Sequence, residues 1–496
     1  MSILGFPKEI QGEIFTHAHR DNSNDEALLL PVEVILSHVC SEWRDISINL
    51  PILWTAFKFD CCRRASAPVD KLEEYLFRSK TQLLELYFDI FTTGCREADQ
   101  RFKLVKIAIA HVCRWRRFTL LVDSIYPPIE VLESLKQLVV DAPHLEYFAM
   151  CLASTSVDGI RNEEHEIINP KDISPSVFIG GAPKLSVVRI DTMSHFYSLP
   201  PLSNITTLTI QDSENREFLY SFRTLRSILM IPALTNLSIE SSMNLDTFDI
   251  DPETLPRIIM PSLKTLRIAQ GYYIVGILSL IDAPLLETLV LYDLCLISLL
   301  ISQDINKMTA FKNLDTIALL GCRCDLSRGA YFNDPLEGVD AILYELACCA
   351  THVIMSSSDD SPESLFKKGS NLFPFEKYKW PRLQCITLDM STFSGLMNCV
   401  KNLEWSPHPL TVRVVEPMLE HWREVQGDSL TRFEKVCKLE TMKVGDTMMD
   451  EYWPAPGGLF HEDGNLDVID WGESIRARGL LERRASQELW ITELGR

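Results

Sequence analysis

The stretch ILSHVCSEWRDISINLPILW, residues 35–54, places a histidine and a cysteine next to an arginine–aspartate pair. A cysteine nucleophile with a histidine base would need His38 and Cys40 within hydrogen-bond reach of each other. On a helix, residues two apart do not face each other. Cys40 therefore falls on the apolar side and His38 points away, so this spacing disfavours a Cys–His enzyme or metal site.

The same stretch has the periodicity of one amphipathic helix. Apolar side chains recur three or four residues apart, at Val32, Ile35, Leu36, Val39, Cys40, Trp43 and Ile46. A shorter helix is predicted upstream in FPKEIQGEIF, opened by Pro7, with the polar break RDNSNDE between the two. Downstream, LPILW is expected to turn Leu53 and Trp54 back toward the apolar stripe.

These elements, in this order, resemble the F-box, and are most similar to the F-box-like domains of fungi. The resemblance rests on Phe-Pro-x-Glu-Ile at 6–10, Ile14-Phe15, Val-Cys-x-x-Trp-Arg-Asp-Ile at 39–46, and Leu-Pro-x-Leu-Trp at 50–54; Phe6 stands where the family usually has leucine. It implies a helical domain over residues 1–60 that binds the Skp-family adaptor of a cullin-RING ubiquitin ligase. The residues implied in adaptor binding are Phe6, Pro7, Glu9, Ile10, Ile14, Val39, Trp43, Leu53 and Trp54.

A purely structural role for these side chains is the alternative, because an apolar stripe with tryptophan is often simply core. How Val39, Trp43 and Trp54 divide between core and interface is left open by the sequence.

An irregular repeat follows this segment. The pattern Pro-x-Leu-x-x-Leu-x-Leu, with substitutions, occurs eight times, at 142–150, 182–190, 202–210, 231–239, 260–268, 283–291, 311–319 and 380–388, and KTQLLELYF at 80–88 fits the same frame. Each Leu-x-Leu predicts a short strand with apolar residues inward, and stacked units share one core. We expect an α+β protein in which residues 61–390 form a leucine-rich-repeat-like α/β solenoid, a horseshoe; a sandwich of ordinary strands is the rival.

The residues around each Leu-x-Leu pair are predicted to point outward on a concave face. They form a mixed polar surface suited to a target protein. The set is Arg189, Asp191, Gln211, Asn236, Glu240, Arg267, Tyr292 and Asp389. Solvated strand faces without a partner are the simpler alternative for any one of them.

Several segments fall outside the repeat. The stretch 110–122 contains Arg114, Arg116 and Arg117 but alternates as a strand with a solvated basic edge, which favours a structural role over an anion site. Polar insertions are expected near 157–176 and 320–380, the second with a helix at 334–353. Beyond residue 391 the repeat is lost, and 391–496 is expected to cap the array, with helices at 415–425 and 474–490.

Composition restricts the classes of function. A net charge of −20 disfavours nucleic acid or an anionic membrane as partner. The N-terminus has no secretory pattern, so the fourteen cysteines are expected to be reduced in a cytoplasmic or nuclear protein. No catalytic, metal or cofactor motif stands out. We therefore expect a non-enzymatic substrate-recognition subunit without cofactor; the alternatives are a repeat scaffold with no ubiquitin role and, with less support, a Cys–His enzyme.

Overall fold

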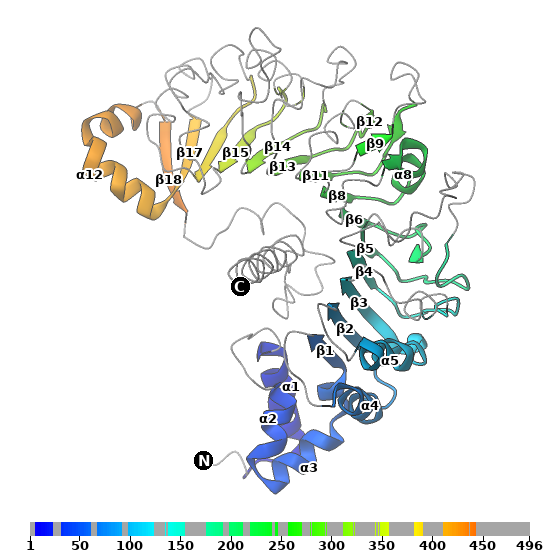
Figure 1. The fold of residues 1–496 in the computed structure, drawn as a ribbon. Helices are drawn as coiled ribbons and strands as arrows, with labels where there is room; N and C mark the ends of the chain where they lie inside the picture. The colour runs from blue at the N-terminus through cyan, green and yellow to red at the C-terminus, as the bar shows by residue number, and fades with distance from the viewer. Residues whose placement is uncertain are drawn as a thin grey trace, which may run out of the picture. The chain divides into compact units, whose positions relative to one another are not determined.

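The computed structural model describes the chain in part (Figure 1). The described residues are 5–22, 31–60, 67–91, 98–123, 137–153, 175–191, 198–211, 219–240, 244–246, 256–269, 280–292, 311–320, 348–356, 381–389, 410–435 and 437–442, with a few single positions between them. They fall into two compact units. One contains Met1–Ala56 and Glu74–Gln82, and the other contains Phe57–Glu73 and Leu83–Trp453.

The first unit is helical. It holds α1 (Lys8–Asn22), α2 (Val32–Val39), α3 (Ser41–Asn49), the 3-10 helix η2 (Pro51–Trp54) and the second half of α4 (Pro68–Arg78). α1 is longer than expected, since it continues through the first part of the predicted polar break. Its core includes Phe15, Leu36, Ile46, Leu53 and Trp54.

The second unit is dominated by one parallel sheet. Among the described residues fourteen strands join in the order β1-β2-β3-β4-β5-β6-β8-β11-β13-β14-β15-β16-β17-β18. Their bounds are β1 Ala56–Asp60, β2 Leu84–Phe91, β3 Trp115–Asp123, β4 Tyr147–Ala153, β5 Val187–Asp191, β6 Thr207–Gln211, β8 Asn236–Glu240, β11 Thr265–Ala269, β13 Thr288–Tyr292, β14 Thr316–Leu320, β15 His352–Ser356, β16 Cys385–Asp389, β17 Leu410–Val415 and β18 Cys437–Met442. The expected mixture of helix and strand is confirmed, and a single parallel sheet differs from the two antiparallel sheets of a sandwich.

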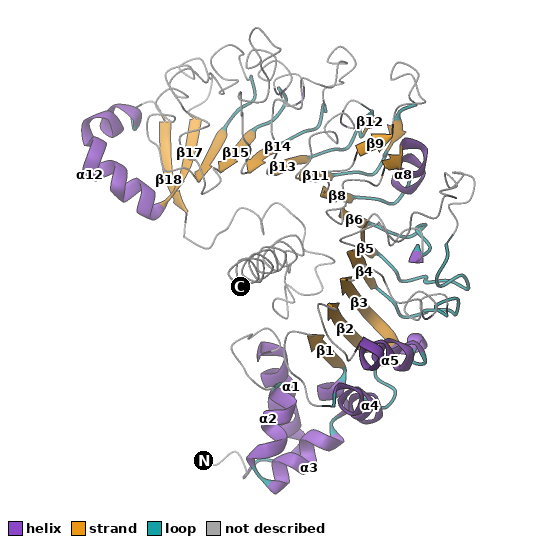
Figure 2. Ribbon diagram, viewed as in Figure 1, coloured by secondary structure: helices purple, strands orange, loops and turns teal. Residues whose placement is uncertain are grey.

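Shorter elements accompany this sheet (Figure 2). Helix α5 (Ala98–Ile109) packs near β2, and α12 (Glu416–Phe433) packs against β17 and β18. α8 (Phe222–Leu229) follows β7 (Leu219–Ser221), which pairs with β9 (Asn244–Asp246), while β10 (Ile258–Ile259) pairs with β12 (Ile281–Asp282). The 3-10 turn η3 (Val112–Arg114) leads into β3.

Each of the eight predicted repeats contains a strand, and neighbouring strands match residue by residue. Leu208, Leu237, Leu266, Leu289 and Ile317 occupy one register position and are buried. The preceding register position is a polar ladder of Thr207, Asn236, Thr265, Thr288 and Thr316, in which Asn236 Nδ2 donates to Thr207 Oγ1 at 3.2 Å. Alternation along a strand places the two ladders on opposite faces.

The buried ladder becomes aromatic at the beginning of the sheet, where Phe118 and Phe148 share the register position of Leu208. Phe57, Phe88, Phe118, Phe148 and Phe178 are buried and form a chain of ring contacts with centroids 5.9, 6.0, 6.1 and 5.4 Å apart. Trp115 stacks on Phe118 at 4.1 Å. Aromatic contacts of this kind add to the free energy of burying the rings, so this ladder binds the first strands into one core.

The proline of the repeat has a turn role. In seven repeats a hydrogen bond closes a four-residue turn around the proline position. The N–H of the leucine-type residue at the end of the turn donates to the carbonyl of the residue at its start, as from Leu185 to Ala182 at 3.0 Å and from Leu314 to Phe311 at 3.0 Å. Proline at the second position of such a turn has the required φ. Where proline is replaced, by Ser203 or Lys312, the next residue is an asparagine that donates to the proline carbonyl of the previous repeat: Asn204 to Pro183 at 3.2 Å and Asn313 to Pro284 at 2.7 Å.

The expected end of the array at residue 390 is corrected. β17 and β18 extend the sheet to Met442, and β15 lies inside the predicted insertion 320–380. The predicted helix at 415–425 is confirmed as part of α12. The helix predicted at 334–353 is wrong at its end, where His352 and Val353 are in β15, and its earlier part lies mostly outside the described residues. The insertion 157–176, apart from its last two residues, and the helix at 474–490 also lie outside them.

Replacement of Lys312 by proline is expected to stabilise the sheet unit. Position 312 occupies the place that proline takes in five of the other turns, and its side chain is exposed. A compatible proline reduces the entropy of the unfolded chain and raises the free energy of unfolding by about 0.4–1 kcal/mol. Urea unfolding followed by tryptophan fluorescence measures this. Asn313→Pro is the matched control and is expected to destabilise, because proline is disfavoured at the third turn position; equal effects of both would contradict the turn assignment.

Candidate protein-interaction surfaces

Cys40 interrupts the single helix that the periodicity predicts. Its φ and ψ of −155° and 173° are extended, so α2 ends at Val39 and α3 begins at Ser41. The Cys40 Sγ accepts a hydrogen bond from the Trp43 backbone N–H at 3.4 Å, which is the role of an N-cap residue. The thiol is half-buried and His38 is exposed, so Cys40 acts here as a helix cap.

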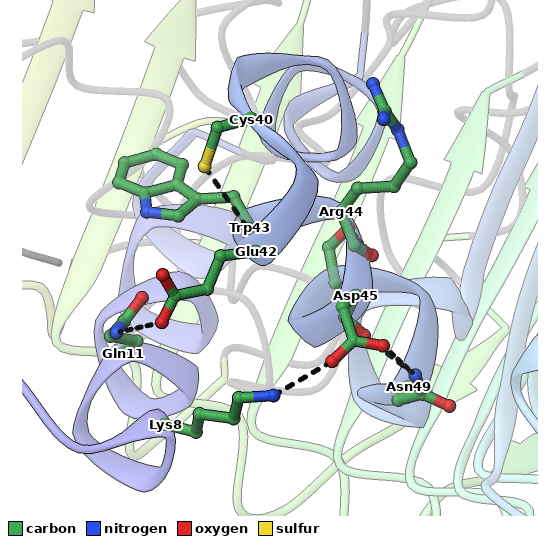
Figure 3. A network of polar contacts seen from close by, with 9 residues as sticks. Lys8, Gln11, Cys40, Glu42, Trp43, Arg44, Asp45 and Asn49 are labelled. Carbon is green, nitrogen blue, oxygen red and sulfur yellow. Dashed lines mark hydrogen bonds and ion pairs between the residues drawn. The ribbon is translucent and has the colours of Figure 1, made fainter.

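Polar contacts fix the N-terminal end of α1 against α3 (Figure 3). Lys8 Nζ lies 3.0 Å from the Asp45 carboxylate, and this hydrogen bond, with the charge of Asp45, raises the pKa of Lys8. Gln11 is buried and donates to the Phe6 carbonyl at 2.9 Å and to Glu42 at 3.4 Å. Beneath these contacts the rings of Phe15 and Trp43 lie 4.8 Å apart. The segment that carries Phe6 and Pro7 is therefore held in place.

A buried carboxylate connects the other end of the helices to α4. Glu33 accepts a hydrogen bond from the Tyr75 hydroxyl and lies 3.4 Å from His19 Nδ1. The Tyr75 ring packs edge-on to Trp54 at 5.1 Å, and the Arg78 guanidinium lies 4.1 Å over the Trp54 ring. These contacts explain why Glu74–Gln82 groups with the helical unit, although the sequence predicted that this unit would end near residue 60.

The predicted adaptor-binding residues separate into exposed and buried sets. Phe6, Ile10 and Val39 are 42%, 46% and 55% exposed, and Pro7 and Glu9 are also exposed. Ile14 and Trp43 are half-buried. Leu53 and Trp54 are buried, and the Trp54 indole N–H donates to the Ser47 carbonyl at 2.8 Å. These two residues hold the unit together, while the exposed set is available to a partner.

Sequence reasoning missed three exposed apolar residues of this unit, namely Ile35, Ile52 and Phe77. Ile35 was assigned to the packed stripe but is exposed, and neither Ile52 nor Phe77 was singled out. Ile35 lies one turn before Val39 on α2, so the spacing of the two could have identified them as a pair.

The predicted concave residues lie on the sheet face opposite the leucine ladder, as the alternation requires. Arg189, Asn236 and Tyr292 are half-buried, whereas Asp191 and Arg267 are buried. Arg267 donates to Ser238 Oγ at 3.1 Å, and its guanidinium lies 5.1 Å over the Tyr292 ring. The backbones of Gln211, Glu240 and Asp389 occupy the corresponding edge positions; their side chains lie outside the described set.

The centre of this face is apolar. Val290, Ala318, Leu320 and Ile354, on β13, β14 and β15, form one buried cluster against which Tyr292 packs. Of the predicted target-binding residues only Tyr292 lies on these three strands, and its neighbours on this face are aliphatic.

Burial also decides the charge state of polar groups in the sheet. His352 Nε2 lies 2.7 Å from Thr387 Oγ1, and burial, with a smaller effect of Arg413, lowers the pKa of His352 to about 4. Burial raises the pKa of its register neighbour Cys385, which keeps that thiol protonated. Arg117 is buried, and burial lowers its pKa to about 9. The predicted solvated basic edge at 110–122 is therefore wrong for Arg117, although Trp115–Asp123 is a strand.

In the part of the chain that the structure describes, no three histidine, cysteine or acidic side chains come together as metal ligands. The described cysteines are free thiols, and the Sγ of buried Cys322 donates to the Leu291 carbonyl at 3.2 Å. Within the same residues, no helix has the length and hydrophobicity needed to span a bilayer.

No protein-family model matches the sequence, and no curated protein matches it significantly. Assignment of function therefore rests on the residues themselves.

Replacement of Tyr75 by phenylalanine is expected to destabilise the helical unit. Glu33 would lose the hydrogen bond from the Tyr75 hydroxyl while staying buried, at a cost of about 1–3 kcal/mol. Burial, and next the charge of Glu33, raise the pKa of Tyr75, so the folded state keeps a proton that the unfolded state loses above pH ~10. The stability from this group is thus present below pH ~10 and lost at higher pH. Urea unfolding at pH 8 and pH 11 measures both effects.

The wild type should lose more stability than the Tyr75→Phe variant between these two pH values. Phe77→Leu, a change at an exposed position on the same helix, is the control and should behave as the wild type. An identical alkaline loss in the wild type and the Tyr75→Phe variant would contradict the role given to the Glu33 contact.

Proposed function

We propose that this chain is the substrate-recognition subunit of a Skp–cullin–F-box ubiquitin ligase. In this proposal the helical unit binds a Skp-type adaptor, and the sheet unit is a leucine-rich-repeat-like horseshoe that binds a target protein. The chain performs no chemistry of its own: it raises the effective concentration of the target near the ubiquitin-charged enzyme.

The observation that carries the proposal is the exposure of Phe6, Ile10 and Val39. Large apolar side chains on a small, well-packed helical unit are typical of a surface that binds a partner. They fall at positions that the F-box resemblance implicates. The polar contacts of Lys8 and Gln11 support this, because a pre-ordered N-terminal segment loses less entropy on binding.

The repeat unit supports the second half of the proposal. Parallel strands in chain order, the same turn before seven of them and a buried leucine ladder are features of leucine-rich repeats. A threonine ladder occupies register positions next to the leucines, whereas regular leucine-rich repeats carry asparagine ladders.

A scaffold without a ubiquitin role is the second candidate. The Glu33–Tyr75 and Trp54–Arg78 contacts favour it, because they bind α4, which follows β1 in the chain, into the helical unit as a terminal cap would require. In that case the exposed apolar residues would bind no adaptor.

Binding to a purified Skp-family adaptor tests the proposal. Ile10→Asp and Val39→Asp are expected to weaken binding at least tenfold, since burying such a side chain contributes about 1.5–3 kcal/mol. Both positions are exposed, so folding should be unchanged in circular dichroism. Affinity is measured by calorimetry with the full-length chain.

Phe77→Asp is the matched control, because Phe77 is 79% exposed in the same unit and outside the implicated set. It is expected to bind as the wild type. No binding by the wild type, or equal affinities for all variants, would overturn the ligase proposal and leave the scaffold.

A further inference from the structure

The edge of the sheet from which the strands start carries exposed apolar side chains. Ile179, Met230 and Ile259 lie in the segments that precede β5, β8 and β11 and are 60%, 40% and 53% exposed. By contrast, Asp191 and Arg267 on the predicted concave face are buried. Among the described residues of this unit, the exposed large apolar side chains therefore lie in the segments that precede strands of the large sheet.

A hollow of about 240 Å³ opens at this edge between consecutive repeats. Its lining is mostly apolar, with Pro175, Leu199, Pro200, Leu202, Met230 and Pro232, and also contains Ser203 and Ser227. The volume is below the ~300–1,000 Å³ of small-molecule sites, so it suits one or two apolar side chains of a larger partner.

Backbone hydrogen bonds hold both walls of the hollow. On one side the N–H groups of Ser176 and Val177 donate to the Leu199 carbonyl at 2.8 and 3.3 Å, and Ser176 Oγ accepts from the Leu199 N–H at 2.9 Å. On the other side Met230 N–H donates to the Arg226 carbonyl at 3.0 Å. A preformed hollow of this kind limits the entropy lost on binding.

Arg226, next to the lining residue Ser227, places a positive charge near the hollow in a strongly acidic chain. Arg226 lies one helical turn before Met230, and its Nε donates to the carbonyl of the exposed Arg257 at 3.3 Å. Among the described residues no carboxylate pairs with either guanidinium, whereas the nearby Lys264 pairs with Glu287 at 2.9 Å. Two such arginines beside an apolar hollow complement acidic groups beside an apolar side chain.

We propose that this hollow is a docking site for an acidic, apolar segment of a partner protein. One apolar side chain, of the size of leucine or phenylalanine, enters between Leu202 and Met230, and flanking carboxylates pair with Arg226 and Arg257. That this partner is the target of a ligase rests on the proposed function. Binding at the hollow itself does not require the adaptor.

Fluorescence anisotropy with the full-length chain and five labelled peptides tests the site. Each peptide has Leu, Ile, Met, Phe or Trp flanked on both sides by two glutamates. At least one is expected to bind, and its counterparts with lysine for glutamate or serine for the apolar residue are expected to bind about tenfold more weakly or worse. Failure of all five, or equal binding of the lysine counterparts, would overturn the proposal.

Three variants locate the binding. Arg226→Glu reverses the rim charge and Ser203→Trp fills the hollow, and each is expected to weaken peptide binding at least tenfold. Lys312→Glu, an equal charge change in the turn of a later repeat, should stay within twofold. Unchanged binding by Arg226→Glu, or binding of anionic lipid vesicles in place of the peptides, would overturn the site.

The assay contains no adaptor, so the two proposals fail separately. Loss of peptide binding would leave adaptor binding unaffected, and an Ile10→Asp variant that loses the adaptor is expected to keep the peptide.

Discussion

The sheet unit depends on the burial of each strand's apolar residues by its two neighbours. A five-residue strand such as Thr265–Ala269 exposes most of its side chains when isolated, and Leu266 and Ile268 are fully buried only because β8 and β13 lie in register beside it. A slip by one residue would bring Thr265 or Arg267 to the leucine side. The same turn precedes seven of the described strands and helps to set this register, and its hydrogen bond recurs even where proline is replaced, at Ser203 and Lys312.

The strands that the sequence predicted are mostly those in which leucine fills the buried positions and proline the turn before them. The leucines and the prolines identified eight of the fourteen strands, and the 80–88 match identified β2. β15, β17 and β18 were missed because HVIMS, LTVRVV and CKLETM lack the preceding Pro-x-Leu. Val353, Ile354, Leu410, Val412 and Val414 of β15 and β17 are nevertheless buried, whereas among the described side chains of β18 only Cys437 is. The phenylalanines at 57, 88, 118, 148 and 178 recur about every thirty residues, and that period was a signal of the aromatic core.

The helical unit shows why a periodic stripe does not fix a helix. Val39 and Trp43 are four apart, as on one helix, yet Cys40 between them is extended and starts a new one. Because no residues are inserted at the break, the apolar period continues through it. Only the capping hydrogen bond of Cys40 distinguishes two helices from one. The same limit explains Ile35 and Leu36: both belong to the stripe, but Leu36 is buried and Ile35 is exposed, a difference set by the position of α1 and α3 that no single-helix pattern contains.

Burial of the sheet face opposite the leucine ladder limits what that face can contribute to the free energy of binding a partner. A partner gains little from residues such as Val290 or Ile354 that have almost no accessible area, however apolar they are. Exposed apolar groups that are already rigid contribute most to the binding free energy, because their surface is removed from water and little conformational entropy is lost. In the described residues Phe6, Ile10 and Val39 on the helical unit and Met230 at the edge of the sheet are exposed, and Arg226 beside Met230 is half-buried. Two separate surfaces of this kind fit the proposed role, in which one chain brings an adaptor and a target together.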